Sequence, residues 1–198
     1  MITLPAGLVP NSARVAQVDF GFVQRPALGG ALSRINRPGN RWQIELGWPT
    51  MPADDARTLV RRLSAAVTEG LRVVLPLQGV SQGDPGTAIV VNGSGAAGTA
   101  LPLRGLVPNV AIKEGWWLTA IDSAGVHYLH QVAAPAVANG SGQVTLAITP
   151  MLRAPLVDGN TVLLAKPLVE GVITDQIGWE LSPGSLVSGI GCVIEEAA

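Results

Sequence analysis

The chain has little charge, few aromatic residues, two histidines and a single cysteine. Charged residues make up 14% of its 198 residues and aromatic residues 4%, whereas hydrophobic residues make up 47%. This composition supports a buried core and is not that of a disordered chain. The length suits one sizeable domain or two small ones. Because charges are so sparse, we expect much apolar surface, as in a protein that works within an assembly.

These absences exclude several kinds of site. Cys192 has no partner for a disulfide within the chain, and its apolar neighbours predict a small buried side chain rather than a nucleophile. His127 and His130 are three residues apart on a predicted strand, so they face opposite sides and cannot share a metal ion. We expect them to be ordinary surface or half-buried imidazoles. No apolar run reaches the length of about 18 residues that crosses a membrane.

One glycine pattern matches a cofactor motif in its spacing. Gly-x-Gly-x-x-Gly at 93–98 follows a predicted strand, and Glu114 lies roughly 20 residues on, where a ribose-binding acid is expected. The third glycine of that motif must open a helix whose N-terminus holds the pyrophosphate. Pro102 and Pro108 lie where this helix would run. We therefore predict a glycine-rich connection in or next to the first hairpin of its region, and no cofactor.

No set of residues forms a recognisable catalytic or metal site. Catalysis needs a nucleophile, a base and an orienting group, or a cluster of metal ligands. The adjacent carboxylates Asp54–Asp55 are explained by a predicted helix start, and Glu195–Glu196 by a solvated chain end. The phosphate-loop pattern Gly-x-x-x-x-Gly-Lys-Ser/Thr is absent. We expect no catalytic residues, no bound metal and a protein that is not an enzyme.

The first region combines strands with one helix. Alternating residues predict strands at 14–24 and 40–48, and the second strand places Trp42, Ile44, Leu46 and Trp48 on one face. A tight-turn signal at 37–40 predicts that residues 31–36 pair with the second strand as a hairpin.

A helical period follows at residues 52–69. Its apolar stripe is predicted to comprise Ala56, Leu59, Val60, Leu63 and Val67. Gly70 suits the residue after the helix end, and a strand is predicted at 71–75.

The second region, residues 85–167, is rich in glycine and proline and has short β-like segments. These predicted strands lie at 88–91, 116–122, 126–132, 143–148 and 161–165. They predict a small barrel or sandwich. Residues 168–198 add two or three more strands. The fold class is therefore mainly β with one amphipathic helix.

Trp116 and Trp117 are the candidate surface residues. Neighbours on a strand point to opposite faces, so one indole can fill a core while the other reaches the surface. The outward indole could stack on a sugar or contact a protein partner.

Charge is distributed unevenly along the chain. Residues 1–72 carry nine arginines and five acidic residues, a net charge of +4, whereas residues 73–198 carry a net charge of −5. Two explanations fit this distribution. The charges are either scattered and solvated, or they belong to oppositely charged surfaces that meet between copies of the chain.

Four stretches, in this order, resemble the distal tail proteins of long-tailed bacteriophages and the related minor tail proteins of the tail tip. They are Arg41-Trp-Gln-Ile-Glu-Leu-Gly-Trp-Pro-Thr-Met-Pro52 before the helix, Gly70-Leu-Arg-Val-Val-Leu-Pro76 after it, Ser141-Gly-Gln-Val-Thr-Leu-Ala-Ile-Thr-Pro-Met-Leu-Arg153, and the last strand ending in Glu195-Glu196. The resemblance implies a ring-forming β-sandwich with one helix, made of residues 1–84 and 168–198. It implies an inserted β-barrel of the OB type at 85–167.

The resemblance also implies a structural role in the virion. Such proteins form hexameric rings at the distal end of the tail, joining the tail tube to the tail-tip hub or baseplate and its fibres. The expected partners are therefore copies of the chain itself, the tail tube protein and the hub and fibre proteins. No membrane partner is expected, and contact with nucleic acid is expected only as DNA passes through the ring.

Two other functions remain open. A carbohydrate-binding β module would use Trp116 or Trp117 as a stacking platform and bind glycans as a monomer. A nucleic-acid binder of the OB type would show an affinity that falls steeply with salt.

Overall fold

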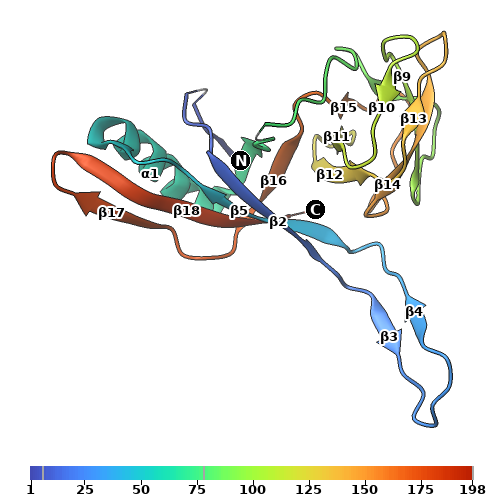
Figure 1. Cartoon of the computed structure of the whole chain (residues 1–198), viewed down its shortest axis with the longest axis horizontal. Coiled ribbons are helices and arrows are strands. Elements are labelled where there is room, and N and C mark those ends of the chain that lie inside the picture. The colour runs from blue at the N-terminus through green and yellow to red at the C-terminus, as the bar shows by residue number, and fades with distance from the viewer. Residues whose placement is uncertain (6, 78, 198) are drawn as a thin grey trace.

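The computed structural model describes residues 1–5, 7–77 and 79–197 and shows two lobes with a projecting hairpin (Figure 1). It is mainly β with one helix, which confirms the predicted fold class. The sheet lobe is an eight-stranded sheet with the helix packed on it, and the inserted lobe is built around a six-stranded sheet.

The sheet lobe joins strands from the beginning and the end of the chain. Its strands run in the order β1-β7-β16-β18-β5-β2, and β17 and β6 also pair with β18. They are β1 (Ile2–Thr3), β2 (Ser12–Val18), β5 (Arg41–Gly47), β6 (Met51–Pro52), β7 (Leu71–Val74), β16 (Leu168–Ile173), β17 (Gly178–Ser182) and β18 (Leu186–Glu196). The antiparallel pairs β16–β7 and β18–β5 bring residues 168–196 against residues 41–74.

The sheet has one buried face and one polar face. The predicted apolar face of β5 is buried: Trp42, Ile44, Leu46 and Trp48 all belong to the core. Its alternate residues are half-buried or exposed. A polar outer face needs no covering layer, so the described residues form one sheet backed by a helix in place of the expected two-sheet sandwich.

The helix α1 (Ala53–Glu69) lies against β1, β6, β7, β16 and β18. Its buried residues are Ala56, Leu59, Leu63 and Ala66. Val67, predicted on the buried stripe, is 51% exposed, because Ala66 continues the stripe three residues after Leu63. Gly70 follows the helix with φ 78°, a conformation that favours glycine. No helix in the described part of the chain is long and apolar enough to cross a membrane.

The inserted lobe has its own core and short strands. Its sheet runs β15-β11-β12-β14-β9-β8. Its strands are β8 (Val90–Val91), β9 (Ala100–Arg104), β11 (Trp117–Ile121), β12 (His127–Val132), β14 (Val144–Thr149) and β15 (Val162–Leu163), and a separate pair is formed by β10 (Ala111–Ile112) and β13 (Ala136–Val137). The strand β8 and Thr161, the residue before β15, meet at a single isolated bridge, Val90–Thr161. Two-residue strands are too short to form a continuous ladder, so the expected barrel is not closed.

The glycine-rich stretch lies in the first hairpin of this lobe. The strands β8 and β9 pair antiparallel, and the connection between them contains Gly93, Gly95 and Gly98, all with positive φ. Gly98 leads into a strand, not into a helix. The Gly93 N–H donates to the carboxylate of Asp158, 2.7 Å away. The Gly93 N–H, which a bound phosphate would need as a donor, is therefore already hydrogen-bonded to a carboxylate of the protein itself.

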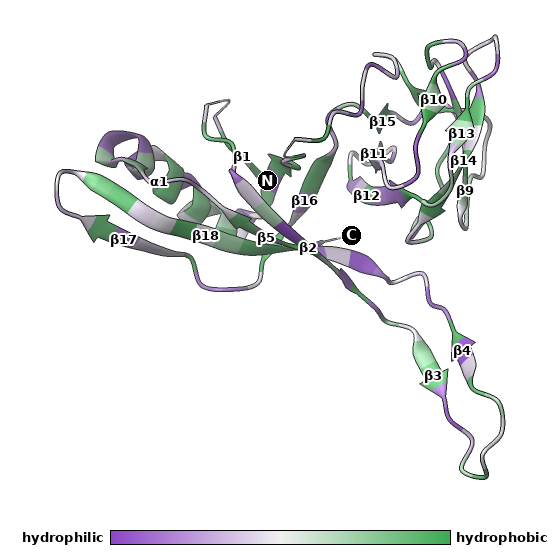
Figure 2. Ribbon diagram, in the orientation of Figure 1, coloured by the Kyte–Doolittle hydropathy of each residue, from purple (hydrophilic) through white to green (hydrophobic). Residues whose placement is uncertain are grey.

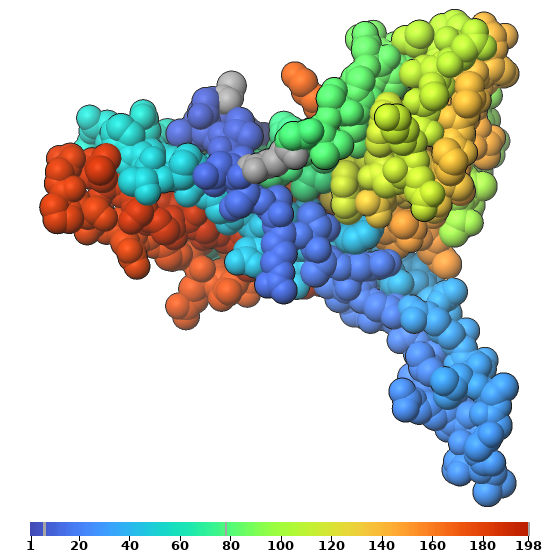
Figure 3. Space-filling view, viewed as in Figure 1, coloured from blue at the N-terminus to red at the C-terminus, as the bar shows by residue number. Residues whose placement is uncertain are grey.

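Residues 19–40 form a long hairpin, called the arm here, that projects from the sheet lobe (Figures 1 and 3). It contains β3 (Phe22–Gln24) and β4 (Ser33–Ile35), which pair with each other, while β5 pairs with β2. The predicted hairpin between residues 31–36 and β5 is therefore wrong. The chain reverses at the arm's tip, where Gly29 has φ 77° and its N–H donates to the Pro26 carbonyl.

Candidate functional site

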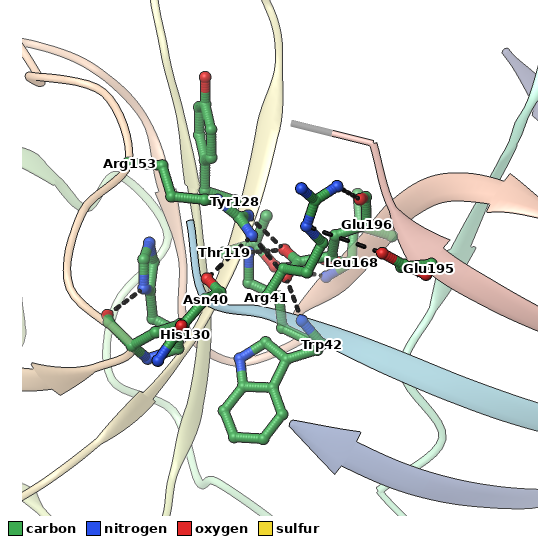
Figure 4. A network of polar contacts seen from close by, with 12 residues as sticks. Asn40, Arg41, Trp42, Thr119, Tyr128, His130, Arg153, Leu168, Glu195 and Glu196 are labelled. Atoms are coloured by element: carbon green, nitrogen blue, oxygen red, sulfur yellow. Dashed lines mark hydrogen bonds and ion pairs between the residues drawn. The ribbon is translucent and has the colours of Figure 1, made fainter. Parts of the chain in front are cut away.

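A buried carboxylate joins the two lobes. Glu196, on β18, accepts hydrogen bonds from both terminal nitrogens of Arg153 in the inserted lobe, at 2.8 and 3.0 Å (Figure 4). Its oxygens also accept from the backbone N–H groups of Trp42 and Leu129, at 2.7 and 2.8 Å. The side chains of Arg153 and Glu196 are 8% and 1% exposed. The two lobes are thus held together by charge-assisted hydrogen bonds out of contact with water.

Neighbouring side chains extend this network to the base of the arm. The Arg153 guanidinium lies over the Tyr128 ring, 5.2 Å from its centroid. Arg41 forms an ion pair with Glu195 at 3.8 Å and lies 4.9 Å from the ring centroid of Phe20. Both carboxylates of the network, Glu195 and Glu196, thus face an arginine.

The sequence expectation for Glu195–Glu196 was wrong for Glu196, which is buried and not a solvated chain end. A signal for this was present in the sequence. Glu196 continues the two-residue period of Cys192 and Ile194, which both point into the core.

A second polar contact crosses the junction at His127. Its Nδ1 lies 3.0 Å from Oε2 of Glu170 on β16, and Glu170 also forms an ion pair with Arg72 at 2.6 Å. Burial, reinforced by the positive charge of Arg72, outweighs the attraction of Glu170 and lowers the pKa of His127. The Nδ1 atom also lies 3.0 Å from the carbonyl oxygen of Gly125, so its N–H is placed between that carbonyl and the Glu170 carboxylate.

Two uncharged contacts complete the junction. The Gln82 amide accepts from the Trp117 N–H at 2.5 Å and donates to the carbonyls of Trp117 and Leu164. The Thr119 hydroxyl donates to the Leu168 carbonyl at 2.6 Å and accepts from the Leu168 N–H at 2.7 Å. Because these bonds satisfy the backbone where the chain passes between lobes, they fix the course of both connections.

The structure places Trp116 and Trp117 in different cores, both half-buried. Trp117 packs against the core of the sheet lobe and meets the Trp42 ring edge to face, with centroids 4.9 Å apart. Trp116 packs against the core of the inserted lobe. The Trp117 indole is therefore part of the junction between the lobes. The Trp116 indole belongs to the inserted lobe alone.

The other titratable candidates are buried. His127 and His130 are both buried, contrary to the expectation of surface or half-buried imidazoles. Burial lowers the pKa of His130 to about 4. Its Nδ1 lies 2.9 Å from the Pro150 carbonyl oxygen. Burial raises the pKa of the Cys192 thiol to about 12, so little reactive thiolate exists at neutral pH. The described residues contain no group of three or more His, Cys, Asp or Glu side chains that could hold a metal ion.

A hollow of about 1010 Å³ lies between the N-terminal segment, β7 and the connection to the inserted lobe. Its lining is mainly aliphatic and includes Leu8, Val80 and Pro76. The charged residues in the lining are Arg72 and Lys166. Among the described residues that line it there is no Asp, Glu, His or Cys, so the hollow offers no general acid or base of these types.

No protein-family model matches the chain, and no curated protein is significantly similar to it.

The remaining candidate surfaces are the two hairpins at the ends of the sheet lobe. Figure 2 shows apolar residues on β3 and on the β17–β18 hairpin, both of which extend away from the lobe centre. The exposed apolar residues of the arm are Phe20, Phe22, Val23, Leu28, Leu32 and Ile35, and those of the other hairpin are Trp179, Leu181 and Leu186. Large apolar residues gathered on projecting elements indicate protein–protein contact surfaces.

Proposed function

We propose that this protein is a structural subunit of the distal tail of a long-tailed bacteriophage, with copies forming a ring that joins the tail tube to the tail-tip hub and fibres. The observation that carries the proposal is the arm. Six large apolar side chains on a 22-residue hairpin are exposed, and one of them, Leu28, is completely so. A hairpin with no core of its own is marginal in water, so we expect it to be stabilised by a neighbouring subunit.

The junction between lobes supports the same role. A subunit that joins a tube to other components needs its two lobes held at a set relative position. Arg153 and Glu196 supply such a constraint with buried, hydrogen-bonded charges, and Gln82 adds a second at the chain crossing. Polar residues are used here to hold lobes together, which suits a structural subunit.

The proposal is tested by the mass and shape of the purified protein. We expect light scattering and native mass spectrometry to show a concentration-dependent rise to a hexamer. Negative-stain images should show rings with a central opening. A variant in which residues 22–37 are replaced by a short Gly-Ser turn tests the arm. It should keep the unfolding transition of the two lobes and lose assembly. Assembly that is unchanged in this variant would contradict the role of the arm.

The alternative is a carbohydrate-binding β module, and it now depends on Trp116, since Trp117 packs against Trp42. A monomer that binds glycans, and loses binding in Trp116→Ala while Trp179→Ala keeps it, would favour this alternative. Trp179 is a suitable control because it is 44% exposed on the other lobe.

A further inference from the structure

The arm has a complementary surface on the same molecule that it cannot reach. The β17–β18 hairpin, residues 174–188, is called the acidic hairpin here. Figure 1 shows it at the opposite end of the sheet lobe from the arm. Both elements expose apolar residues. The acidic hairpin lies beside the start of α1, where the Ser185 carbonyl accepts from the Ala53 N–H. A contact between the two elements must therefore join different copies of the chain.

The charges of the two hairpins are opposite. The arm contains Arg25, Arg34 and Arg37 and one acid, Asp19, which forms an ion pair with Arg34 at 2.5 Å. Arg25 and Arg37 are exposed and form no ion pair with a described residue. The arm thus offers two free positive charges next to its apolar side chains.

The acidic hairpin has the converse character. It contains Asp175 and Glu180, both exposed and without an ion pair among the described residues. No lysine, arginine or histidine occurs after Lys166. Trp179 and Leu181 flank Glu180 and are 44% and 80% exposed. The hairpin therefore presents exposed negative charge and exposed apolar side chains, with Glu180 on one face of β17 and Trp179 and Leu181 on the other.

The backbone of both elements is also open. The strand β17 pairs with β18 on one side, and no pairing of its other edge occurs among the described residues. In the arm, β3 and β4 pair only with each other, which leaves two free edges. Exposed edges of this kind pair readily with a strand of another chain.

We infer that the arm of one copy docks on the acidic hairpin of the next copy. Arg25 and Arg37 face Asp175 and Glu180, and Phe22, Leu28 and Ile35 pack on Trp179 and Leu181. The contact joins two different surfaces, so it propagates head to tail and closes a ring when the rotation allows. This inference deepens the proposed function, on which it rests for the identity of the ring.

Charge reversal in two separate chains tests the contact. The arm variant is Arg25→Glu with Arg37→Glu, and the hairpin variant is Asp175→Arg with Glu180→Arg. Each variant alone brings like charges together, so we expect its self-association to weaken by roughly tenfold or more. A one-to-one mixture places opposite charges at every contact and should restore association. All four positions are exposed, so unfolding curves should match the wild type.

The matched control is Arg61→Glu with Lys113→Glu, which changes net charge as much as the arm variant, at exposed positions outside both hairpins. It should associate like the wild type. Light scattering across a concentration series, at low and high salt, gives the readout, and the wild-type contact should weaken as salt screens the charges.

The outcomes separate the two ideas. Variants that associate like the wild type, a mixture that fails to restore association, or a wild-type chain that stays monomeric at every concentration would each overturn the inferred contact. If rings persist in the charge-reversed variants, the ring stands and the contact falls. If the mixture restores only a closed dimer, the contact stands and the ring falls.

Discussion

Glu196, on the last strand of the chain, is bound by both terminal nitrogens of Arg153, which lies 43 positions earlier in the other lobe. The same carboxylate accepts two backbone N–H groups, one from β5 and one from β12. Four donors from three parts of the chain thus meet on one side chain. Of the contacts that position the inserted lobe, this carboxylate gathers the most donors, so its replacement is the most direct test of the junction.

Glu196→Gln should be strongly destabilising. It leaves the Arg153 charge buried without a counterion, which costs about 3–5 kcal/mol in the free energy of unfolding. Urea unfolding at pH 7 measures this. Glu45→Gln is the control, since its pair with Arg14 is long and exposed and contributes about 0–1 kcal/mol. Equal losses in the two variants would show that the junction does not bear on stability.

Gln82→Ala should destabilise the connection between the lobes. The substitution leaves the Trp117 N–H and two carbonyls without their side-chain partners, at a cost of about 1–3 kcal/mol. Thermal unfolding measures the loss, and hydrogen exchange of the Trp117 amide should become faster. Gln176→Ala, at an exposed site, is the control. An unchanged exchange rate at Trp117 would contradict the structure of this connection.

Stability should fall on the acid side because of His130. The pKa of His130 is lowered to about 4 in the folded protein, whereas an unfolded histidine titrates near 6.5. Between these values the unfolded chain binds a proton that the folded chain does not. Above about pH 6.5 the neutral His130 therefore costs the folded protein no stability. As the pH drops towards 4, proton binding to the unfolded chain lowers the free energy of unfolding by about 3 kcal/mol.

The variant His130→Phe isolates this effect. It removes the titrating imidazole from a fully buried site. We expect urea unfolding at pH 7 and pH 4.5 to show a smaller difference in the variant than in the wild type. The same difference in both proteins would mean that other groups cause the acid sensitivity.

Cys192 should not react with thiol reagents while the protein is folded. Its side chain is buried in the sheet core, and burial raises its pKa to about 12. We expect the folded protein not to react with a chromogenic disulfide reagent at pH 8. After urea unfolds the protein, one reactive thiol per chain should be titrated. Rapid reaction of the folded protein would contradict both the burial and the structural role assigned to this residue.

Some features follow from the sequence because they are local. The faces of β5 and the extent of α1 depend on a period of two or of 3.6 residues, which neighbouring side chains reveal directly. The turns at Asp122–Gly125 and Asn139–Gly142 are local in the same sense, because Asp122 and Asn139 each accept from backbone N–H groups two and four residues on.

Other features depended on which distant segments meet. The arm forms because β2 pairs with β5 across 22 residues. The burial of Glu196 was likewise decided by packing between lobes, and that of His130 by packing within the inserted lobe, where its Nδ1 lies 2.9 Å from the Pro150 carbonyl oxygen. The sequence by itself determined the fold class, the helix and the core faces, since periodicity is a local property. The tertiary structure alone decided the junction and the projecting hairpins, because a polar residue becomes buried only when a surface distant in sequence supplies its partners.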